Sequence, residues 1–489
     1  MRRPPFIALV AGLAAALLSL LIAPDPPELG NARGGDRALG ERVLEMVAGD
    51  TGGYRGLSVA FIDRGRVSSA LLGDPAGGPL FEIGSVQKTM TGMLLADLSA
   101  AGVVDPQDTL GETLPAVKLG DPTASITLEE LASQRSGLPR VSPDRLAFAR
   151  SLLTNVNGGN PYAGADVGAL FDSAAGAEPG DDRGEVGYSN FGMALLGQAL
   201  AVKAGTTYQQ LVTDRILRPL GMSSTYPLPA DPAPPGLARG TIASGLDAEP
   251  WTSAGYAPAG AGPRSTAEDL ARLVSATMAG TAPGADAARP RFDGDADGER
   301  IGYAWFTDRY GDRDITWHNG STGGFRSYVG FDRSTGQGVV VLGNTDRPVE
   351  WIGLSLLGAE VPAGLRSASP GLPRIAIGLV LLGYGALALL LLAVVRKRSI
   401  WLPEADRLRV VGSTVSTVAV LLVVHRVGAW LILPPWLWSL AVGGAAAGLA
   451  ALLLRWRGLP VIADGRPAVR RAGTAVSLAV SAVVLWLIV

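Results

Sequence analysis

Five long apolar runs dominate the hydrophobic pattern of the chain, one at the N-terminus and four at the C-terminus. The first extends from Phe6 to Ala23 and follows Arg2 and Arg3. The other four cover about residues 375–395, 410–430, 436–454 and 472–489. A helix needs ~20 apolar residues to cross a bilayer, and each run is close to that length. The pattern therefore predicts a signal peptide or N-terminal membrane anchor over residues 1–24 and four transmembrane helices within residues 374–489.

The fate of the N-terminal run depends on the residues at its end. Pro24 follows Ala23, and Leu21 occupies a position where a cleavage site needs a small residue. Both features make this a poor cleavage site. We therefore favour an uncleaved anchor over a signal peptide that is removed.

Basic residues between the apolar runs predict the orientation of the chain. They cluster between the first and second C-terminal runs, at 396–409, and between the third and fourth, at 455–471. Loops rich in Lys and Arg stay in the cytoplasm, so both segments are expected there. Residues 30–370 then lie on the extracytoplasmic side, and Arg2 with Arg3 before the first run predicts the same arrangement.

Residues 35–360 show the shorter periodicities of a globular domain. Runs at 57–62 and 67–72 predict a β-hairpin, and later strands are expected at 301–306, 315–317, 328–331 and 339–342. Helical patterns between them begin near residues 85, 127, 191 and 265. Strands at both ends of a helical middle predict an α/β domain of the α+β kind, with one antiparallel sheet and a helical subdomain packed on it. Residues 361–373 form the expected linker to the membrane region.

Composition narrows the chemistry that this domain can perform. A net charge of -2 gives no electrostatic reason to expect a nucleic acid as partner. The chain has no cysteine and only two histidines, so thiol catalysis, zinc-thiolate sites and a histidine-rich metal centre are not expected. We expect neither a metal nor a cofactor. There is also no Gly-x-Ser-x-Gly sequence, which argues against an α/β-hydrolase.

A serine and a lysine at helical spacing are the first candidates for catalysis. Ser85 and Lys88 are three residues apart at the start of a predicted helix, so they share one face of it. A serine hydroxyl is a weak nucleophile until a neighbouring base activates it, and Lys88 could be that base. A Ser-x-x-Lys tetrapeptide also occurs by chance on solvated helices, so other parts of the chain must support this interpretation.

Three further stretches support it, and together they resemble a known family. They are Ser136-Gly137-Leu138-Pro139, Tyr188-Ser189-Asn190 and His318-Asn319-Gly320. Their order after the Ser-x-x-Lys stretch resembles the serine β-lactamase and penicillin-binding protein superfamily. The nearest branch holds class C β-lactamases, D-aminopeptidases, DD-carboxypeptidases and β-lactamase-like esterases. The resemblance extends over about residues 39–358 and implies a β-lactamase/transpeptidase-like fold.

The resemblance also implies a role for each residue of these motifs. Ser85 would be the acylated nucleophile, Lys88 its base, and Tyr188 a partner in proton transfer. Asn190, His318 and Gly320 would bind the substrate. The backbone N–H groups of Ser85 and Ser321 would form the oxyanion hole, which stabilises charge that develops in the transition state.

His318 departs from the commonest pattern of the superfamily, which has lysine at this position. The resemblance associates histidine here with esterases, aminopeptidases and carboxypeptidases more than with β-lactamases. An unperturbed histidine titrates near pH 6.5, so we expect a carboxylate-bearing substrate to be held less firmly at alkaline pH. No counterpart of the class A general-base glutamate is recognisable, so deacylation would depend on Tyr188 and Lys88.

The expected protein is a multi-pass enzyme of the bacterial plasma membrane with an extracytoplasmic serine hydrolase domain. Its partners would be the lipid bilayer and a small-molecule or peptidoglycan-derived substrate. D-amino acyl peptides, small esters or small amides are the expected substrates, and the reaction would pass through an acyl-enzyme. Two alternatives stay open: a β-lactamase that hydrolyses β-lactam antibiotics, and a non-catalytic cell-wall sensor or binding module. The sequence gives no indication of the oligomeric state.

Overall fold

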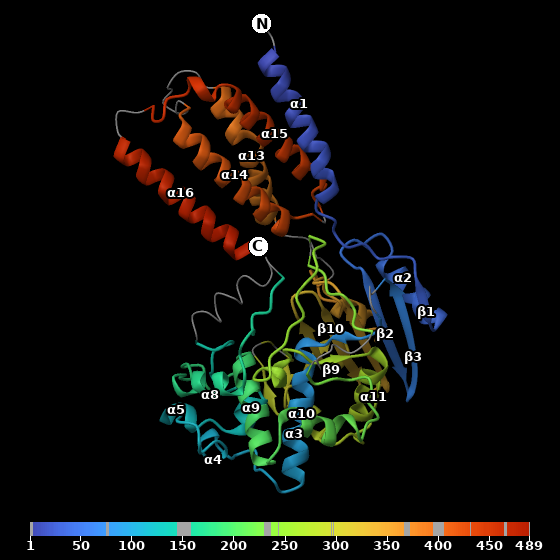
Figure 1. Ribbon diagram of the computed structural model, residues 1–489. Helices are drawn as coiled ribbons and strands as arrows, with labels where there is room; N and C mark the ends of the chain where they lie inside the picture. The colour runs from blue at the N-terminus through green and yellow to red at the C-terminus, as the bar shows by residue number, and fades with distance from the viewer. Residues whose placement is uncertain are drawn as a thin grey trace. The chain divides into compact units, whose positions relative to one another are not determined.

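A computed structural model of the chain divides into two compact units (Figure 1). It describes residues 3–74, 78–143, 158–228, 236–242, 244–294, 296, 298–365, 372–394, 405–430, 432–463 and 467–488. One unit, here called the globular unit, comprises Pro27–Ile242 and Asp247–Ala368. The other, the helical unit, comprises Met1–Pro26, Ala243–Leu246 and Ser369–Val489.

A nine-stranded antiparallel sheet forms the centre of the globular unit. Its order is β1-β3-β2-β11-β10-β9-β8-β7-β6, so strands from the two ends of the unit meet where β2 pairs with β11. The strands are β1 (Arg33–Gly35), β2 (Gly56–Asp63), β3 (Arg66–Gly73), β6 (Phe292–Asp293), β7 (Arg300–Ile301), β8 (Phe306–Tyr310), β9 (Arg313–Ser321), β10 (Arg326–Asp332) and β11 (Gln337–Gly343). A separate two-stranded sheet pairs β4 (Phe81–Glu82) with β5 (Arg264–Ser265).

Both faces of the central strands are covered, which explains their nearly continuous apolar sequences. Val59 and Val341 face a core formed with α2 (Arg37–Val47) and α12 (Glu350–Leu356). Their neighbours Ala60 and Val340 face the opposite core, which includes α11 (Ala267–Met278) and the helical subdomain. Side chains alternate between the two faces of a strand, so each strand contributes to both cores.

The helical subdomain lies between the two groups of strands in the sequence and packs on one face of the sheet. Its helices are α3 (Gln87–Ala100), α4 (Leu110–Thr113), α5 (Asp121–Ala124), α6 (Leu128–Ala132), α8 (Val167–Ala175), α9 (Asn190–Lys203) and α10 (Tyr208–Val212). The helix α3 is buried along most of its length, and Met90, Met93 and Leu94 have no exposed surface. It is therefore the central helix of this unit.

The predicted α+β architecture is confirmed, with one local error. The hairpin, the three last strands and the helices near residues 87, 128, 190 and 267 all form. Thr127 and Glu130 make a capping box at the start of α6. The predicted strand at 301–306 is wrong: it contains the end of β7, a bend and the start of β8. Ala304 lies in the bend with φ of 59°, a left-handed conformation that breaks a strand. Residues 144–157 lie outside the described residues.

Five helices of the helical unit are long and apolar enough to cross a membrane. They are α1 (Arg3–Ser19, continued by a short 3-10 turn to Ile22), α13 (Leu372–Val394), α14 (Arg407–Val427), α15 (Trp436–Leu454) and α16 (Pro467–Ile488). The four predicted C-terminal runs all form helices. The helix α16 begins several residues earlier than the apolar run alone predicted, and it includes Arg470 and Arg471 as its fourth and fifth residues.

Glycines on α15 allow two other helices to approach it closely (Figure 1). A Cβ added to Gly443 would come within 2.8 Å of Ala16 Cβ on α1, and one added to Gly12 would come within 2.8 Å of Gly443 O. On the α13 side, a Cβ on Gly448 would come within 2.4 Å of the Leu389 backbone. Small residues at helix contacts are typical of membrane bundles. The N-terminal helix therefore packs as a member of the bundle.

We expect residues 1–24 to stay on the mature protein, since α1 fills a close contact on α15. Intact mass spectrometry of the purified protein should give the mass of the uncleaved chain. Gly12→Leu should lower the thermal midpoint in detergent by several degrees because the new side chain separates the two helices. Gly383→Leu is the control, since a Cβ there meets no atom within 4 Å. A measured mass that lacks residues 1–24 would contradict retention. Equal thermal midpoints for Gly12→Leu and Gly383→Leu would contradict the close packing of α1 on α15.

Candidate active site

Ser85 lies at the start of the central helix, in a backbone geometry that requires glycine beside it. A 3-10 turn, Gly84–Val86, precedes α3 and carries the serine. Gly84 has φ of 49°, in the left-handed region that glycine adopts without strain. The hydroxyl faces a cavity of about 480 Å³. Ser85 is half-buried and reachable from that cavity, as a nucleophile must be.

Lys88 is completely buried beneath the serine. Its Nζ lies 2.7 Å from Ser85 Oγ and donates a hydrogen bond to the carbonyl oxygen of Ala259 at 2.6 Å. Burial, and secondly the charge of Arg140, lower the pKa of Lys88 well below its usual value. A neutral amine has a lone pair that can accept the Ser85 proton. Lys88 therefore has the position expected of a general base, and its lowered pKa favours the neutral form that such a base needs.

Tyr188 lies on the other side of the serine. Its ring is 4.9 Å from Lys88 Nζ, and its hydroxyl forms a hydrogen bond with Ser85. Burial raises the pKa of Tyr188 to about 12, while that hydrogen bond and the nearby Arg140 act in the opposite direction. Tyr188 therefore keeps its proton near neutral pH. It is placed to donate a proton, while Lys88 is placed to accept one.

The Ser136-Gly137-Leu138-Pro139 turn fixes the segment that carries Tyr188. Ser189 caps α9, and its hydroxyl also donates to the carbonyl oxygen of Pro139 at 2.8 Å. The Asn190 N–H donates to the Arg140 carbonyl oxygen at 3.0 Å. These bonds attach the last residue of the turn and the residue that follows it to the start of α9. The turn, which had no assigned role in the sequence, therefore holds Tyr188 and Asn190 in place.

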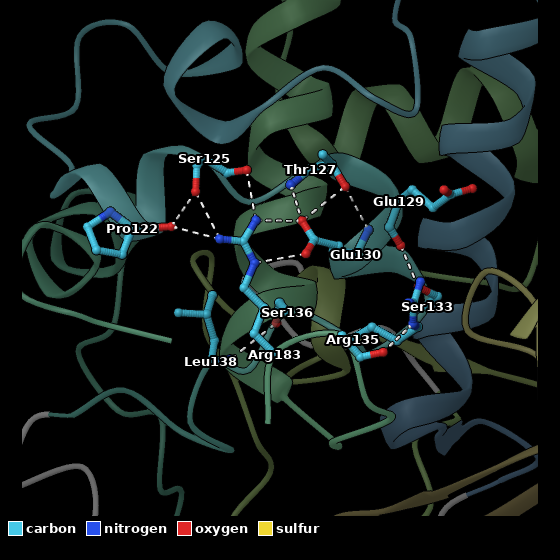
Figure 2. Close-up of polar contacts among 11 residues, drawn as sticks. Pro122, Ser125, Thr127, Glu129, Glu130, Ser133, Arg135, Ser136, Leu138 and Arg183 are labelled. Carbon is cyan, nitrogen blue, oxygen red and sulfur yellow. Dashed lines mark hydrogen bonds and ion pairs between the residues drawn. The ribbon is translucent and has the colours of Figure 1, made fainter. Parts of the chain in front are cut away.

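Arg183 provides a second attachment for the loop that precedes Tyr188 (Figure 2). Its guanidinium makes two hydrogen bonds to the Glu130 carboxylate, at 2.8 and 2.9 Å, and another to Ser125 Oγ at 2.9 Å. Glu130 also belongs to the capping box of α6, so the ion pair joins this helix to the loop before Tyr188. Bidentate pairs of this kind fix orientation as well as distance.

The backbone N–H groups of Ser85 and Ser321 lie close to Gly84, Gly260 and Gly320. A Cβ added to Gly320 would come within 3.0 Å of Ser85 N, and one added to Gly84 within 2.8 Å of Ser321 N. Gly260 has φ of 109°, and a Cβ there would meet Ser85 N at 2.8 Å. The end of β9 is thus pressed against the turn that holds the nucleophile. This brings together the two N–H groups predicted to form the oxyanion hole.

Asn190 lies on the wall of the cavity with one polar atom available. Its Nδ2 donates to the Tyr162 hydroxyl at 3.0 Å, while its buried Oδ1 has no partner among the described residues. An unpaired buried acceptor costs free energy unless a ligand supplies a donor. Asn190 Oδ1 therefore matches the predicted contact with a substrate N–H.

His318 is placed differently from its predicted role. The side chain is 1% exposed and does not line the cavity, whereas its neighbours Asn319 and Gly320 do. Its Nδ1 lies 2.6 Å from the Asn319 carbonyl oxygen and donates to it, so Nε2 is an acceptor. Burial, and secondly the Lys88 charge, lower the pKa of His318 to about 3. The expectation of a group that titrates near pH 6.5 and holds a carboxylate does not hold in this environment.

Two arginines that sequence reasoning missed supply positive charge to the cavity instead. Arg140 lies with its guanidinium 4.8 Å from the Tyr188 ring centre, and Arg326 lines the opposite strand end. Neither forms an ion pair with a carboxylate among the described residues, and no acidic residue lines the cavity there. Arg140 follows the SGLP turn directly, but an arginine in a loop gives no signal in a single sequence.

A buried ion pair supports the back of the site. Glu82 on β4 lies 3.6 Å from Arg264 on β5, and its carboxylate accepts a hydrogen bond from the Trp251 N–H at 3.0 Å. Burial raises the pKa of Glu82 to about 7, although Arg264 acts in the opposite direction. Trp251 lines the cavity, so the pair fixes part of its wall. Within the described ranges, no three histidine, aspartate or glutamate side chains are grouped as a metal site would require.

We expect the buried neutral state of His318 to appear in the stability of the protein. Between about pH 3 and 6.5 the unfolded chain binds one proton more at this residue than the folded chain. The free energy of unfolding should therefore rise with pH over this window, by up to about 1.4 kcal/mol per pH unit. His318→Gln should show a smaller rise in thermal midpoint between pH 4.5 and 6.5 than the wild type. Equal rises would show that the histidine is not held neutral.

Known proteins share this arrangement of sheet and helices. Among solved structures, a class C beta-lactamase from Rhodobacter sphaeroides has a TM-score of 0.53 and 24% identity, covering 64% of this chain and 94% of that one. A beta-lactamase/D-alanine carboxypeptidase from Pseudomonas syringae has a TM-score of 0.55 and 19% identity, covering 67% and 98%. These likenesses concern the fold.

Sequence comparison gives the family. A curated relative, the D-alanyl-D-alanine-carboxypeptidase/endopeptidase AmpH of Escherichia coli K12, is 30% identical over 197 residues. That match covers 39% of this chain and 47% of the relative, so the chain spans about half the length of such relatives. The sequence profile of the Beta-lactamase family matches residues 40–361, most of the chain and nearly all of the globular unit. The chain belongs to the beta-lactamase family.

Proposed function

We propose that the protein is a membrane-anchored serine hydrolase that acts through an acyl-enzyme at Ser85. The observation that carries this proposal is the contact of 2.7 Å between Ser85 Oγ and the buried Lys88 Nζ, at the floor of an open cavity. A buried lysine with a lowered pKa is costly to keep unless it performs a task. A sensor that only binds a cell-wall fragment would not need this pair.

In the acylation step, Ser85 Oγ attacks a carbonyl carbon and Lys88 accepts its proton. The new C–O bond moves the carbonyl electron pair onto oxygen, where the N–H groups of Ser85 and Ser321 stabilise the charge. The bond to the leaving group then breaks. The leaving group takes the bonding pair, and Tyr188 supplies its proton, because its raised pKa keeps it protonated. The proton on Lys88 then passes to the Tyr188 phenolate, whose ring lies 4.9 Å from Lys88 Nζ, and both groups return to their starting states.

Deacylation would use the same groups in reverse. Water attacks the acyl carbon, a base removes its proton, and Ser85 Oγ leaves with the bonding pair and a proton. Among the described residues that line the cavity there is no glutamate or aspartate to act as this base. We therefore assign this step to Lys88 and Tyr188, which is the assignment expected in the sequence analysis. A slow deacylation would make the enzyme easy to trap as its acyl form.

The substrates we propose are D-amino acyl peptides, with small esters or amides as alternatives. The AmpH relative is named as a carboxypeptidase and endopeptidase for D-alanyl-D-alanine, and the P. syringae neighbour as a beta-lactamase and D-alanine carboxypeptidase. Asn190 Oδ1, unpaired in the cavity, suits an amide substrate with a free N–H. Hydrolysis of β-lactams is the alternative activity of the same site.

We also propose that the globular unit lies on the extracytoplasmic side of a plasma membrane. Support comes from the five apolar helices and from the basic residues that cluster between the C-terminal ones. The substrates proposed above occur on that side. A labelling reagent that cannot cross membranes would therefore reach Ser85 in intact cells.

Ser85 should be labelled by a fluorophosphonate and by a fluorescent penicillin. Ser85→Ala should abolish the label, and Lys88→Met should reduce its rate at least about 100-fold, since general base catalysis contributes ~10² to 10⁴. Ser321→Ala is the matched control and should keep the label, because only the backbone N–H of this residue is used. Turnover of a D-alanyl peptide, a short-chain ester and a chromogenic cephalosporin then ranks the substrates. Absence of label from both reagents in the wild type would refute the hydrolase.

Arg140 should select substrates that carry a free carboxylate. The buried neutral His318 cannot attract an anion, whereas Arg140 is exposed at the cavity beside Tyr188. A hydrogen bond to a charged group contributes about 1.5–3 kcal/mol. Arg140→Gln should therefore raise KM about tenfold or more for an N-acyl-D-alanyl-D-alanine with a free carboxylate.

The matched substrate is the same peptide with a C-terminal amide, for which KM should change little. Arg218→Gln, which alters an exposed arginine paired with Asp214 outside the cavity, serves as the control variant. Steady-state kinetics on the two peptides checks the prediction. If Arg140→Gln affects both peptides equally, the arginine acts on Tyr188 rather than on the carboxylate.

A further inference from the structure

Two helices of the helical unit begin side by side and run in the same direction. Ser416 on α14 lies 2.7 Å from Ser477 on α16, oxygen to oxygen, and both serines are nearly three turns from the start of their helices. Near the first turns, Thr474 Cγ2 would be 3.4 Å from a Cβ on Gly412. The N-terminal ends of α14 and α16 are therefore neighbours at one end of the bundle.

Positive charge accumulates at this end. The exposed N–H groups of a helix start already carry partial positive charge, which acidic residues normally balance. Here the first turns of α14 and α16 contain no acidic residue, Arg407 is the first residue of α14, and Arg471 is the fifth residue of α16. The neighbouring carboxylate, Asp406, is fully buried, caps α14 and pairs with Arg470 at 3.3 Å. Neither Arg407 nor Arg471 pairs with a carboxylate among the described residues.

An apolar cavity of about 430 Å³ is lined by residues of both helices, Arg407 and Arg471 among them. The Arg407 guanidinium lies 5.6 Å from the centre of the Trp456 ring, and Arg471 lies on the facing helix. Leu408, Val411 and Leu478 contribute apolar side chains from the two helices. The lining therefore combines two arginines and a tryptophan with apolar side chains of α14 and α16.

We propose that this cavity binds an anionic phospholipid. The phosphate would lie between Arg407 and Arg471, and an acyl chain would follow the apolar walls of α14 and α16. Basic pockets between membrane helices bind anionic head groups in this way, and each arginine near the surface contributes to the attraction. The hydropathy of both helices places the walls within the hydrocarbon layer and the arginines at its boundary. A free phosphate would leave the apolar walls without a contact.

Native mass spectrometry of the full chain in detergent tests this proposal. The protein is titrated with dioleoyl phosphatidylglycerol and, separately, with dioleoyl phosphatidylcholine, which has the same chains but no net charge. We expect the first bound phosphatidylglycerol to have an affinity about tenfold higher. Arg471→Gln should reduce that ratio about fivefold, as expected for one arginine at a membrane surface. The double variant Arg407→Gln/Arg471→Gln should bring it close to one.

Arg457→Gln is the matched control, since this exposed arginine lies at the same end of the bundle but outside the cavity. It should keep the preference of the wild type. The single Arg471 variant protects the test against misfolding, because Arg407 also donates to backbone carbonyl oxygens. Equal binding of the two lipids by the wild type would overturn the proposal. So would a preference that survives in the double variant or falls equally in Arg457→Gln.

Discussion

Burial of one lysine is the constraint on which the rest of the site depends. Lys88 has no exposed surface, and its nearest polar neighbours are a hydroxyl and a carbonyl oxygen rather than a carboxylate. Without an anionic partner, burial favours the neutral amine over the charged one, which is the form that the proposed base requires. The buried helix α3 holds the amine in this position, and the Ala259 carbonyl orients it. The same burial raises the pKa of Tyr188, which suits the complementary role of proton donor that we propose for it.

The pairing of Ser85 with Lys88 could be predicted from local spacing, whereas the roles of Tyr188 and Asn190 came from the family resemblance. Ser85 and Lys88 are three residues apart on a helix, and Ser189 caps the helix that begins at Asn190, so both motifs have a physical signature. The state of His318 could not be predicted in this way. Whether a histidine titrates depends on what covers it, and the cover comes from distant segments that include Lys88 and Phe306. Acceptors such as the Ala259 carbonyl have no sequence signal at all.

The fold could be predicted to a similar degree, and its prediction failed for a similar reason. Apolar runs and alternating strands indicate which segments are buried, and the sheet and the membrane helices formed where those patterns lie. The pattern does not indicate where a helix begins if charged residues continue it. The helix α16 includes Arg470 and Arg471, which hydropathy alone assigned to a loop. This extension places an arginine near the start of a helix, where it faces a second helix start.

Glycines around Ser85 also determine where this domain can vary. Gly84, Gly260 and Gly320 leave no room for a side chain near the Ser85 N–H, so replacement of any of them would displace the nucleophile or the strand beside it. Single substitutions of these glycines at the floor of the cavity are therefore expected to disturb the site. Its rim, where Arg140 and Trp251 lie on loops, can accept new side chains without moving the reacting atoms. Engineering or divergence toward new substrates would accordingly alter the rim and keep the chemistry of the floor.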